Sequence, residues 1–587
     1  MTIDIIVILV YFAFLMSIGW LFRTFSNSTS DFFKGGGKML WWMVGATAFM
    51  TQFSAWSFTG AAGKAYSDGF AILATFLGNA VGYFGNYLFF AAKSRQMRVV
   101  TPIEGVRLRF GKVNEQVFTL AAVPSSTISA GIWLNSLAIF VSAVFGISIE
   151  TTIYVTGAIV VLMSVTGGAW AVIASDFLQM VIIMAVSFVA SVVAITKAGG
   201  VSTILETGLP EASPFSATGH TYFAIFVVWV IASFAKQFLS TNNMIDSYRY
   251  MCAKDTKNAR KAALLACILM FVGPFIWFVP AWFMAGPGQV FAGQIEELGK
   301  DATYYVFIKN YLPTGMVGLM MSAMFAATMS SMDSALNRNA GIYVRNVYRV
   351  FVNKEATEEK MIKVGKTTTL LLGVCIILLA QFISSLNNLD LFSLMQTVSS
   401  LIVLPVLIPT FFGYIVKNTP DWSAWATLIV GAGVSYFVTI IEQPWIEAIL
   451  GTTITSAEFS DMKSLTLGVL LHACITLPFF ICSKYFFKGF SEERQKEYDL
   501  FFSNINTEVV SEDDDEEANA SDNNQRNMLG KLLSLAGGAI TLLVVMPQET
   551  FSSRLVFLAV GAIVLIAGLA LVYSSKPKAL TTENQEQ

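Results

Sequence analysis

Long uninterrupted apolar segments recur along the whole chain. Residues 5–22, IIVILVYFAFLMSIGWLF, contain no charged residue, and about twenty apolar residues are what a helix needs to cross a bilayer. About fifteen such segments can be distinguished by hydropathy, the last near residues 555–573. A transmembrane β-barrel would instead show shorter segments in which alternate residues are apolar. The sequence therefore predicts an all-α membrane protein that crosses the bilayer many times.

The composition supports this interpretation and argues against other classes. Only 13% of the residues are charged, whereas soluble domains have about 25%. The net charge of -2 gives no reason to expect a nucleic-acid partner. The five cysteines form no CxxC pair, and the two histidines, His220 and His472, are far apart, so we expect neither a disulfide framework nor a metal centre. The first segment follows Asp4 and not a basic region, which favours a retained helix over a signal peptide.

The charges of the loops predict the orientation of the chain. Basic residues cluster at 93–112, 249–261 and 338–354, after odd-numbered apolar segments, whereas the loops at 296–301 and 442–461 are acidic. Because cytoplasmic loops carry an excess of lysine and arginine, the N-terminus is predicted to lie outside and the C-terminus in the cytoplasm. We expect a multi-pass protein of the cell membrane.

One long polar segment interrupts the apolar pattern near the C-terminus. Residues 491–528 contain the run SEDDDEEANASDNNQ, and low hydrophobicity with a dense acidic run is typical of disorder. We therefore expect an acidic disordered cytoplasmic linker without chemistry of its own, followed by a last pair of apolar helices.

An acid and several hydroxyls interrupt the apolar segment at 327–338, ATMSSMDSALNR. On a helix one face would carry Ala327, Ser330, Ser331 and Ser334, with Asp333 at its rim. Such oxygen atoms suit a small hard cation, and an acid inside a membrane usually faces an interior pathway. An equally weighted alternative is that the serines bond back to their own helix and that Asp333 pairs with Arg338.

The segment TQFSAWSFTGAAGKAYSDG, residues 51–69, is rich in small residues. Such a sequence permits a broken helix whose freed carbonyl groups can hold an ion, although ordinary packing of small residues is the simpler interpretation. Polar and aromatic groups lie there at membrane depth: Gln52, Ser54, Trp56 and Ser57.

Two further charged residues lie within apolar segments. Asp176, in GGAWAVIASDFLQ, could bind a cation or be stabilised by the dipole at a helix N-terminus. Lys236 is an isolated cation that could meet an anionic group of a substrate or pair with a buried acid such as Asp176. Asn242 and Asn243 follow it and tolerate a helix break.

Together, four segments of this chain resemble the sodium:solute symporter family of sodium-coupled sugar, proline, pantothenate and sialic-acid transporters. They are FKGGGKMLWWMVGATAFMTQFSAWSFTGAAGKAYSDG, GGAWAVIASDFLQ, YRYMCAK and SAMFAATMSSMDSALNRNAGIYVRNVYR. The resemblance covers residues 1–490 approximately.

The resemblance implies an inverted five-plus-five helix repeat (LeuT-like), with about thirteen family spans followed by a C-terminal helical hairpin. The expected parts are listed in chain order: an extra N-terminal helix in 1–38, the inverted-repeat transport core in 39–416, additional helices in 417–490, the acidic linker in 491–528, the transmembrane hairpin in 529–573 and a polar tail in 574–587.

The resemblance also implies a sodium site. Its ligands would be the backbone carbonyls of Met50, Phe53 and Ala327 with the hydroxyls of Ser330 and Ser331. A second sodium, present in some members, would use Asp176, Ser330 and Ser334. This chain departs from the family pattern because Asp333 stands where a hydroxyl is usual, and its carboxylate is a further candidate ligand of the second sodium.

The resemblance implies substrate contacts at Ser57, Phe76, Asn79, Asn242 and Gln396. The polar and aromatic residues singled out above, Gln52, Trp56 and Lys236, are further candidates. Ser57 and Phe76 replace the glutamine and glutamate of sugar transporters, so their sugar-binding pattern is not reproduced. Trp56 resembles the proline branch, and Lys236 favours an anionic solute.

The expected function is import of a small polar organic solute, such as a sugar, a sugar acid or another carboxylated solute, coupled to sodium by alternating access. A proline-like amino-acid symporter and a transporter-like membrane sensor are the alternatives. An enzyme is not expected, because no nucleophile–base pair or metal cluster is evident.

Overall fold

The protein is a bundle of helices. The computed structural model describes residues 2–22, 28–166, 168–207, 220–313, 315–386, 390–510, 516–545 and 551–575. Within these ranges the regular elements are helical, apart from an isolated β-bridge between Met39 and Ala253. Nine of the described helices are long and apolar enough to cross a membrane, and two shorter apolar helices accompany them. The all-helical architecture predicted from the apolar segments is confirmed.

The first half of the core begins with an interrupted helix. Its elements are α3 (Trp41–Thr51), η3 (Ala55–Ser57), α4 (Gly60–Asp68), η4 (Gly69–Ile72), α5 (Leu73–Gly85), η5 (Asn86–Phe90), α6 (Ala91–Gln96), α7 (Pro102–Phe110), α8 (Lys112–Phe145), α9 (Ile149–Thr166) and α10 (Ala169–Ala198). The short helix α11 (Val201–Thr207) follows.

The second half also begins with an interrupted helix. Its elements are α12 (His220–Asn242), η6 (Asp246–Cys252), α13 (Thr256–Val272), α14 (Pro274–Trp277), α15 (Val279–Ala285), η7 (Pro287–Phe291), α16 (Ala292–Leu298), η8 (Lys300–Ala302), α17 (Thr303–Tyr311), α18 (Met316–Ile342), η9 (Tyr343–Val352), α19 (Glu358–Ser385), α20 (Leu391–Val398), η10 (Ser399–Val403) and α21 (Leu404–Phe412).

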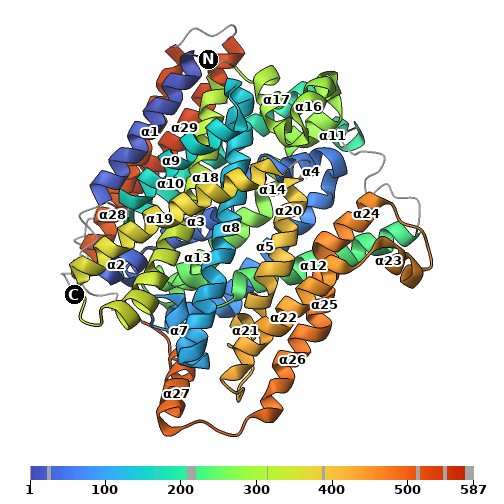
Figure 1. Ribbon diagram of the computed structural model, residues 1–587. Helices are drawn as coiled ribbons and strands as arrows, with labels where there is room; N and C mark the ends of the chain where they lie inside the picture. Colours follow the sequence, from blue (N-terminus) through green and yellow to red (C-terminus); the bar gives the residue numbers. More distant parts are fainter. Residues whose placement is uncertain are drawn as a thin grey trace, which may run out of the picture.

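The two halves pack in a reciprocal pattern. The first helix of each half contacts the second helix of the other: α3 packs against α13, and α12 packs against α5. The third helices of the two halves, α8 and α18, contact each other, and so do the fourth helices, α9 and α19. Figure 1 shows α8 and α18 near the centre of the bundle. Exchanging the halves therefore preserves the contacts, as an inverted repeat requires.

The interruption after α3 is stabilised by side-chain hydroxyls. The Ser54 hydroxyl accepts a hydrogen bond from the backbone N–H of Trp56 at 3.3 Å, which caps the short turn η3. The Thr328 hydroxyl of α18 accepts a hydrogen bond from the N–H of Ala55 at 3.1 Å. Since backbone groups at membrane depth need a partner, these hydroxyls stabilise the break that the small-residue segment permits.

Other helices surround the core. They are α1 (Thr2–Phe22), α2 (Thr29–Lys34), η2 (Gly35–Gly37), α22 (Trp422–Ile440), α23 (Gln443–Leu450), α24 (Ser456–Asp461), η11 (Met462–Thr466), α25 (Leu467–Leu471), η12 (His472–Thr476), α26 (Leu477–Cys482), η13 (Ser483–Phe486), α27 (Glu492–Asn506), α28 (Glu516–Leu542), η14 (Leu543–Val545) and α29 (Phe551–Ser574). The N-terminus lies at the same end of the molecule as α16 and α17, and α7 and α27 lie at the opposite end (Figure 1).

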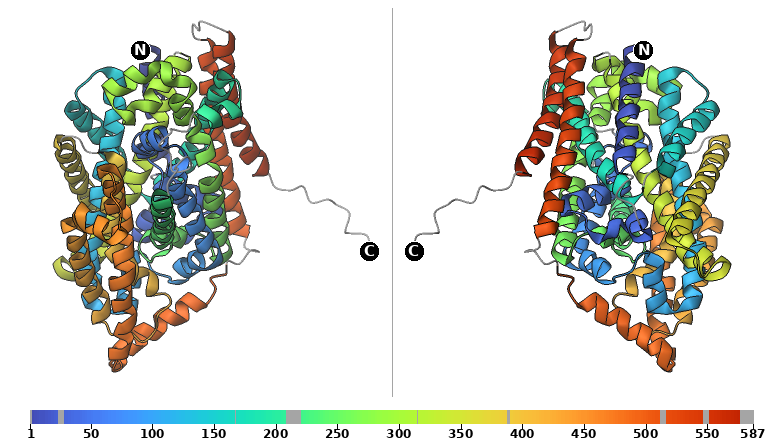
Figure 2. Two further views of the ribbon diagram at one scale, coloured as in Figure 1. Left: turned by 90° about the vertical axis from the view of Figure 1, so that its right-hand side faces the viewer. Right: turned by 90° about the vertical axis from the view of Figure 1, so that its left-hand side faces the viewer.

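Helices α28 and α29 form a tight hairpin along one side of the core (Figure 2). A Cβ atom built on Gly530 would lie 2.8 Å from the carbonyl oxygen of Gly568, and one built on Gly568 would lie 2.8 Å from that of Gly530. Such a close approach of two backbones requires glycine at both positions. The hairpin contacts α10 of the core.

The expectation of disorder throughout residues 491–528 is wrong. Helix α27 occupies Glu492–Asn506, and its Tyr498, Phe501 and Phe502 are buried. The fully buried guanidinium of Arg109 lies over the Phe502 ring, 5.4 Å from its centroid. The aromatic residues at helical spacing provide an apolar face that the acidic run obscured. Residues 511–515 of that run and the polar tail beyond residue 575 lie outside the described residues.

Candidate functional site

Ser331 of α18 lies against the break between α3 and η3. Its hydroxyl is 2.8 Å from the carbonyl oxygen of Phe53 and 3.1 Å from that of Met50, within hydrogen-bond distance of both. The last carbonyl groups of a helix have no N–H group four residues further on, so the break provides acceptors. The hydroxyl of Ser331 therefore points out of its own helix and toward the break, and the alternative of bonding back to α18 is wrong for this residue.

Ser330 and Asp176 provide further buried oxygens beside this contact. Both side chains are at most 1% exposed, and Ala327 is fully buried one turn earlier on α18. Thr47 donates a hydrogen bond to Oδ2 of Asp176. The other carboxylate oxygen, Oδ1, and the Ser330 hydroxyl are buried without a hydrogen-bond partner among the described residues, and the two groups are neighbours.

These residues fit a small cation. The predicted ligand set consists only of carbonyl and hydroxyl oxygens, the hard donors that alkali and alkaline-earth ions prefer. A buried polar atom without a partner is costly, and the hydroxyl of Ser330 is such an atom. A cation bound there would satisfy it.

Asp333 and Ser334 have partners other than those expected. Asp333 accepts a hydrogen bond from Ser164 of α9, and Ser334 accepts one from the buried guanidinium of Arg249 in η6. The expected ion pair between Asp333 and Arg338 is absent, because Arg338 pairs with Asp246 at 2.7 Å. Nor does Asp176 lie at a helix N-terminus, since α10 begins about two turns earlier at Ala169.

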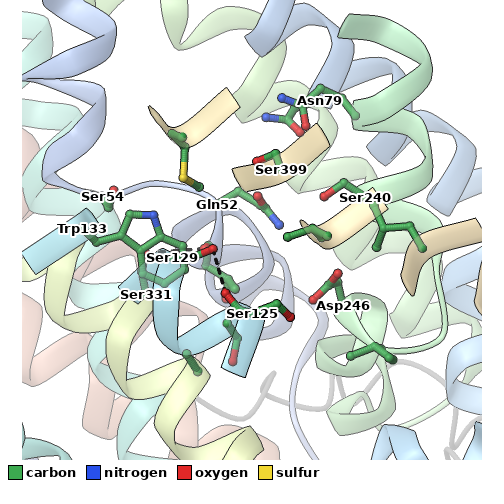
Figure 3. A pocket seen from close by; sticks show the side chains of 18 of the residues that line it. Gln52, Ser54, Asn79, Ser125, Ser129, Trp133, Ser240, Asp246, Ser331 and Ser399 are labelled. Atoms are coloured by element: carbon green, nitrogen blue, oxygen red, sulfur yellow. Dashed lines mark hydrogen bonds between the residues drawn. The ribbon is translucent and has the colours of Figure 1, made fainter. Parts of the chain in front are cut away.

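A cavity of about 150 Å³ with a mixed polar and apolar lining lies beside the break. It is bordered by residues from η3, α5, α8, α12, α18 and α20, and Ser331 contributes to its wall (Figure 3). Six of the residues expected to contact substrate line this cavity: Gln52, Trp56, Phe76, Asn79, Lys236 and Gln396.

Two residues expected to contact substrate do not line the cavity. The amide of Asn242 donates hydrogen bonds to the carbonyl oxygens of Gly82 at 2.9 Å and Phe238 at 2.8 Å, so it joins α12 to α5. Ser57 follows Trp56 on a 3-10 turn, where consecutive side chains project about 120° apart. With Trp56 on the cavity wall, Ser57 is directed elsewhere and its hydroxyl is buried.

Sequence reasoning missed the part of the cavity that α8 provides. Ser125, Ser129 and Trp133 line it, and so do Ser240 and Ser399 from other helices (Figure 3). The three residues of α8 are spaced by four, which places them on one helix face. That spacing in the segment SSTISAGIW was a signal available in the sequence.

Aromatic rings close one side of the cavity. Trp56 is stacked on Phe392 of α20 with the ring centroids 5.7 Å apart and an interplanar angle of 13°, and on Phe76 at 6.4 Å and 22°. The indole N–H of Trp56 donates a hydrogen bond to the carbonyl oxygen of Leu391 at 3.3 Å. The ring thereby connects η3 with α20.

Lys236 also lines the cavity, and the expectation that it pairs with Asp176 is wrong. Its Nζ donates a hydrogen bond to Oε1 of Gln396 at 3.0 Å, and the residue is 5% exposed. Asp176 instead accepts a hydrogen bond from Thr47 of α3.

Ion pairs flank the cavity. At the end where the N-terminus lies, Lys64 of α4 contacts Asp461 of α24 at 2.9 Å, and Lys300 of η8 contacts Asp390, the N-cap of α20, at 3.2 Å. The pair of Arg338 with Asp246 lies on the cavity wall toward the other end. Opening either end would separate charged partners.

The chain is similar in sequence to known sodium-coupled cotransporters. A family model described as the sodium:solute symporter family matches residues 32–431. The sodium/myo-inositol cotransporter 2 of Rattus norvegicus is 27% identical over 462 residues, 73% of this chain and 68% of that protein. The sodium/glucose cotransporter of Vibrio parahaemolyticus is 23% identical over 501 residues, 80% of this chain and 91% of that protein.

A solved structure shares the fold. A sodium-coupled sialic acid symporter in a substrate-bound, outward-open state matches with a TM-score of 0.64 at 20% sequence identity, covering 83% of this chain and 98% of that one. The LeuT-like inverted repeat predicted from the resemblance is confirmed by this likeness.

Proposed function

Because the chain belongs to the sodium:solute symporter family, we propose that it imports a small polar organic solute together with sodium by alternating access. The solute is a sugar, a sugar acid or another carboxylated compound. One observation carries this proposal: the Ser331 hydroxyl of α18 lies within hydrogen-bond distance of carbonyl oxygens at the break after α3, beside the unpartnered hydroxyl of Ser330.

Sodium would bind between α3 and α18. Its ligands are the carbonyl oxygens of Met50, Phe53 and Ala327 and the hydroxyls of Ser330 and Ser331. The ion links two helices that move relative to each other in alternating access, and coupling requires that it bind one conformation more tightly than the other. A membrane potential of ~100 mV contributes about 2.3 kcal/mol per charge moved inward.

A second sodium has candidate ligands next to the first. The unpartnered oxygen of Asp176 and the hydroxyl of Ser330 are neighbours, and Ser334 and Asp333 lie further along α18. Asp333 also accepts a hydrogen bond from Ser164, and Ser334 accepts one from Arg249, so an ion bound to all four residues would share these two ligands with other partners. The two ions would share Ser330.

The solute would bind in the cavity next to the first sodium site. Ser331 borders both, so an ion bound there holds one wall of the cavity in place. Solute enters when the ion pairs of Lys64 and Lys300 separate and leaves when Arg338 and Asp246 separate. Opening of the end that carries Lys64 and Lys300 would also separate the stacked rings of Trp56 and Phe392.

We propose that the N-terminus faces the outside and that the C-terminus and residues 491–528 face the cytoplasm of a cell membrane. The basic residues of α7, which include Arg107 and Arg109, lie at the same end as α27 (Figure 1). This distribution agrees with the excess of basic residues in cytoplasmic loops. Sodium and solute would therefore enter from the end that carries Lys64.

Reconstitution into liposomes tests the proposal. Uptake of a panel of radiolabelled sugars, uronates, carboxylates and amino acids is measured with an inward sodium gradient and with choline in place of sodium. Saturable uptake of a sugar, a uronate or a carboxylate that depends on sodium is expected. Preference for proline or another amino acid would favour the amino-acid symporter. Solute binding without uptake would favour a sensor, and non-saturable flux would favour a channel.

A further inference from the structure

Lys236 is a buried cation without an acidic partner in the part of the chain that the structure describes. Its one hydrogen bond is to the neutral amide oxygen of Gln396 at 3.0 Å, and no described carboxylate lies within ion-pair distance of Nζ. Burying a charge is costly unless it is paired, and inside a membrane such residues usually mark the path of a substrate or ion. A charged Lys236 therefore requires a partner that the described residues do not supply.

The other charges on the cavity wall do not compensate it. Asp246 and Arg338 line the same cavity, but they form an ion pair with each other at 2.7 Å. The lining described here thus carries one net positive charge when Lys236 is protonated. An anionic solute would neutralise this charge, whereas a neutral solute would leave it uncompensated.

Lys236 has donors available for such a solute. An ammonium group has three N–H donors, and Gln396 accepts from one of them. The remaining two can be shared between the oxygens of a carboxylate. Charge-assisted hydrogen bonds of this kind are about twice as strong as neutral ones.

The rest of the lining suits a polyhydroxylated body. Amide and hydroxyl groups of Gln52, Asn79, Ser240 and Ser399 face the cavity (Figure 3) and provide both donors and acceptors. Apolar surface is contributed by the aromatic side chains of Trp56, Phe76 and Trp133, which also line the cavity. The volume of about 150 Å³ is below the ~300–1,000 Å³ of pockets for drug-sized ligands, which restricts the solute to a small one.

We propose that the solute is a small polyhydroxy monocarboxylate, a sugar acid of hexuronate type, and that Lys236 binds its carboxylate. This inference rests on the proposed function and names the substrate class of the same cavity. It also sets the charge balance of transport. A monoanion carried with one sodium ion moves no net charge, whereas the same solute carried with two sodium ions moves one.

The test compares anionic solutes with their neutral counterparts in liposomes. Sodium-driven uptake is measured for D-glucuronate, D-galacturonate and D-gluconate and for D-glucose, D-galactose and D-sorbitol. The wild-type protein is expected to transport at least one of the acids and to prefer it to its neutral counterpart. Lys236→Gln is expected to lower kcat/KM for that acid about 10- to 100-fold, as loss of a charged hydrogen bond implies. Lys236→Arg, which keeps the charge, is expected to retain more uptake than Lys236→Gln.

A control variant and the contrary outcomes distinguish the role of Lys236 from the proposed sodium-coupled symport. Lys309→Gln removes an exposed lysine of α17 outside the cavity and is expected to leave uptake unchanged. Sodium-driven uptake of a neutral solute in preference to its acid, or acid uptake that is unchanged in Lys236→Gln, would overturn the role of Lys236 while leaving symport intact. If none of these six solutes but another carboxylate of the wider panel showed sodium-driven uptake, the assignment of a sugar acid would fail and symport would stand. If no solute of the wider panel showed sodium-driven uptake, the proposed function itself would fail.

Discussion

Replacing Ser330 by alanine separates a binding role from a structural one, because the two roles predict opposite effects on the sodium-free protein. The hydroxyl of Ser330 is buried and has no hydrogen-bond partner among the described residues. An unsatisfied buried polar group costs about 1–3 kcal/mol. In the absence of sodium, Ser330→Ala is therefore expected to leave the free energy of unfolding unchanged or to raise it.

The same change removes one of the proposed sodium ligands. Loss of a hydrogen-bonding group to a charge costs about 1.5–3 kcal/mol, which weakens sodium binding by about 10- to 100-fold or slightly more. Sodium at 100 times its wild-type Kd stabilises a protein by about 2.7 kcal/mol. At the same concentration this stabilisation would fall to about 1.4 kcal/mol for a tenfold loss of affinity and to about 0.4 kcal/mol for a hundredfold loss.

The assay is thermal unfolding of the purified protein, with sodium chloride titrated against choline chloride at constant ionic strength. Ser322→Ala is the matched control, because Ser322 is a buried serine of α18 whose hydroxyl donates within its own helix to the carbonyl oxygen of Gly318 at 2.9 Å. Its loss is expected to lower the sodium-free stability by about 1 kcal/mol and to leave the sodium-induced shift intact. The reasoning is refuted if Ser330→Ala is destabilised without sodium and keeps the full sodium-induced shift.

Three further predictions concern the break, the cavity and α27. Ser331→Ala should weaken sodium binding by about 10- to 100-fold. Unlike Ser330→Ala, it should also lower the sodium-free stability by about 1 kcal/mol, because the Ser331 hydroxyl is hydrogen-bonded to the break. The same titration measures both effects. Trp56→Ala removes an aromatic side chain from the cavity wall and should weaken solute binding by about 2- to 10-fold, with sodium affinity unchanged. Solute and sodium titrations of uptake measure both. Phe501→Ala removes a fully buried ring of α27 and should lower the free energy of unfolding by about 3–5 kcal/mol, which would expose α27 to limited proteolysis. The control Phe486→Ala, at a residue that is 65% exposed, should change little. Equal cleavage of both variants would contradict the docking of α27.

The sequence predicts the fold well because the bilayer restricts what a long apolar segment can form. Helices satisfy their own backbone hydrogen bonds in lipid, so recurring apolar segments are sufficient to predict an all-helical bundle. The break at residues 52–54 could be predicted only in part, because the small residues that follow it are explained equally well by ordinary helix packing. The internal repeat, in contrast, is a relation between contacts such as α3 with α13 and α12 with α5, and no pattern along the chain records such contacts.

Side-chain partners could be predicted less well, because several candidates are equivalent in the sequence. In the sequence, Asp333, Asp246 and Asp176 are equivalent candidates for an ion pair with Arg338. The structure resolves this through the η6 turn, which brings Asp246 to Arg338 and leaves Asp333 to Ser164. Asn242 likewise has the chemistry of a ligand but uses its amide to join α12 to α5.

The packing of α27 against the core could not be predicted from the composition of residues 491–528. The acidic residues that follow it dominate the average hydrophobicity of residues 491–528, whereas three aromatic residues bury its apolar face. A window of helical length centred on Tyr498, Phe501 and Phe502 would have revealed that face. Local periodicity is thus more informative here than the composition of the whole segment.

Binding of radioactive sodium to the purified wild-type, Ser331→Ala and Ser322→Ala proteins tests the central claim most directly, because it requires no knowledge of the solute. Saturable binding is expected for the wild type and for Ser322→Ala, with a Kd about 10- to 100-fold higher for Ser331→Ala. Wild-type sodium affinity in Ser331→Ala would show that the ion does not bind between the break in α3 and the hydroxyls of α18.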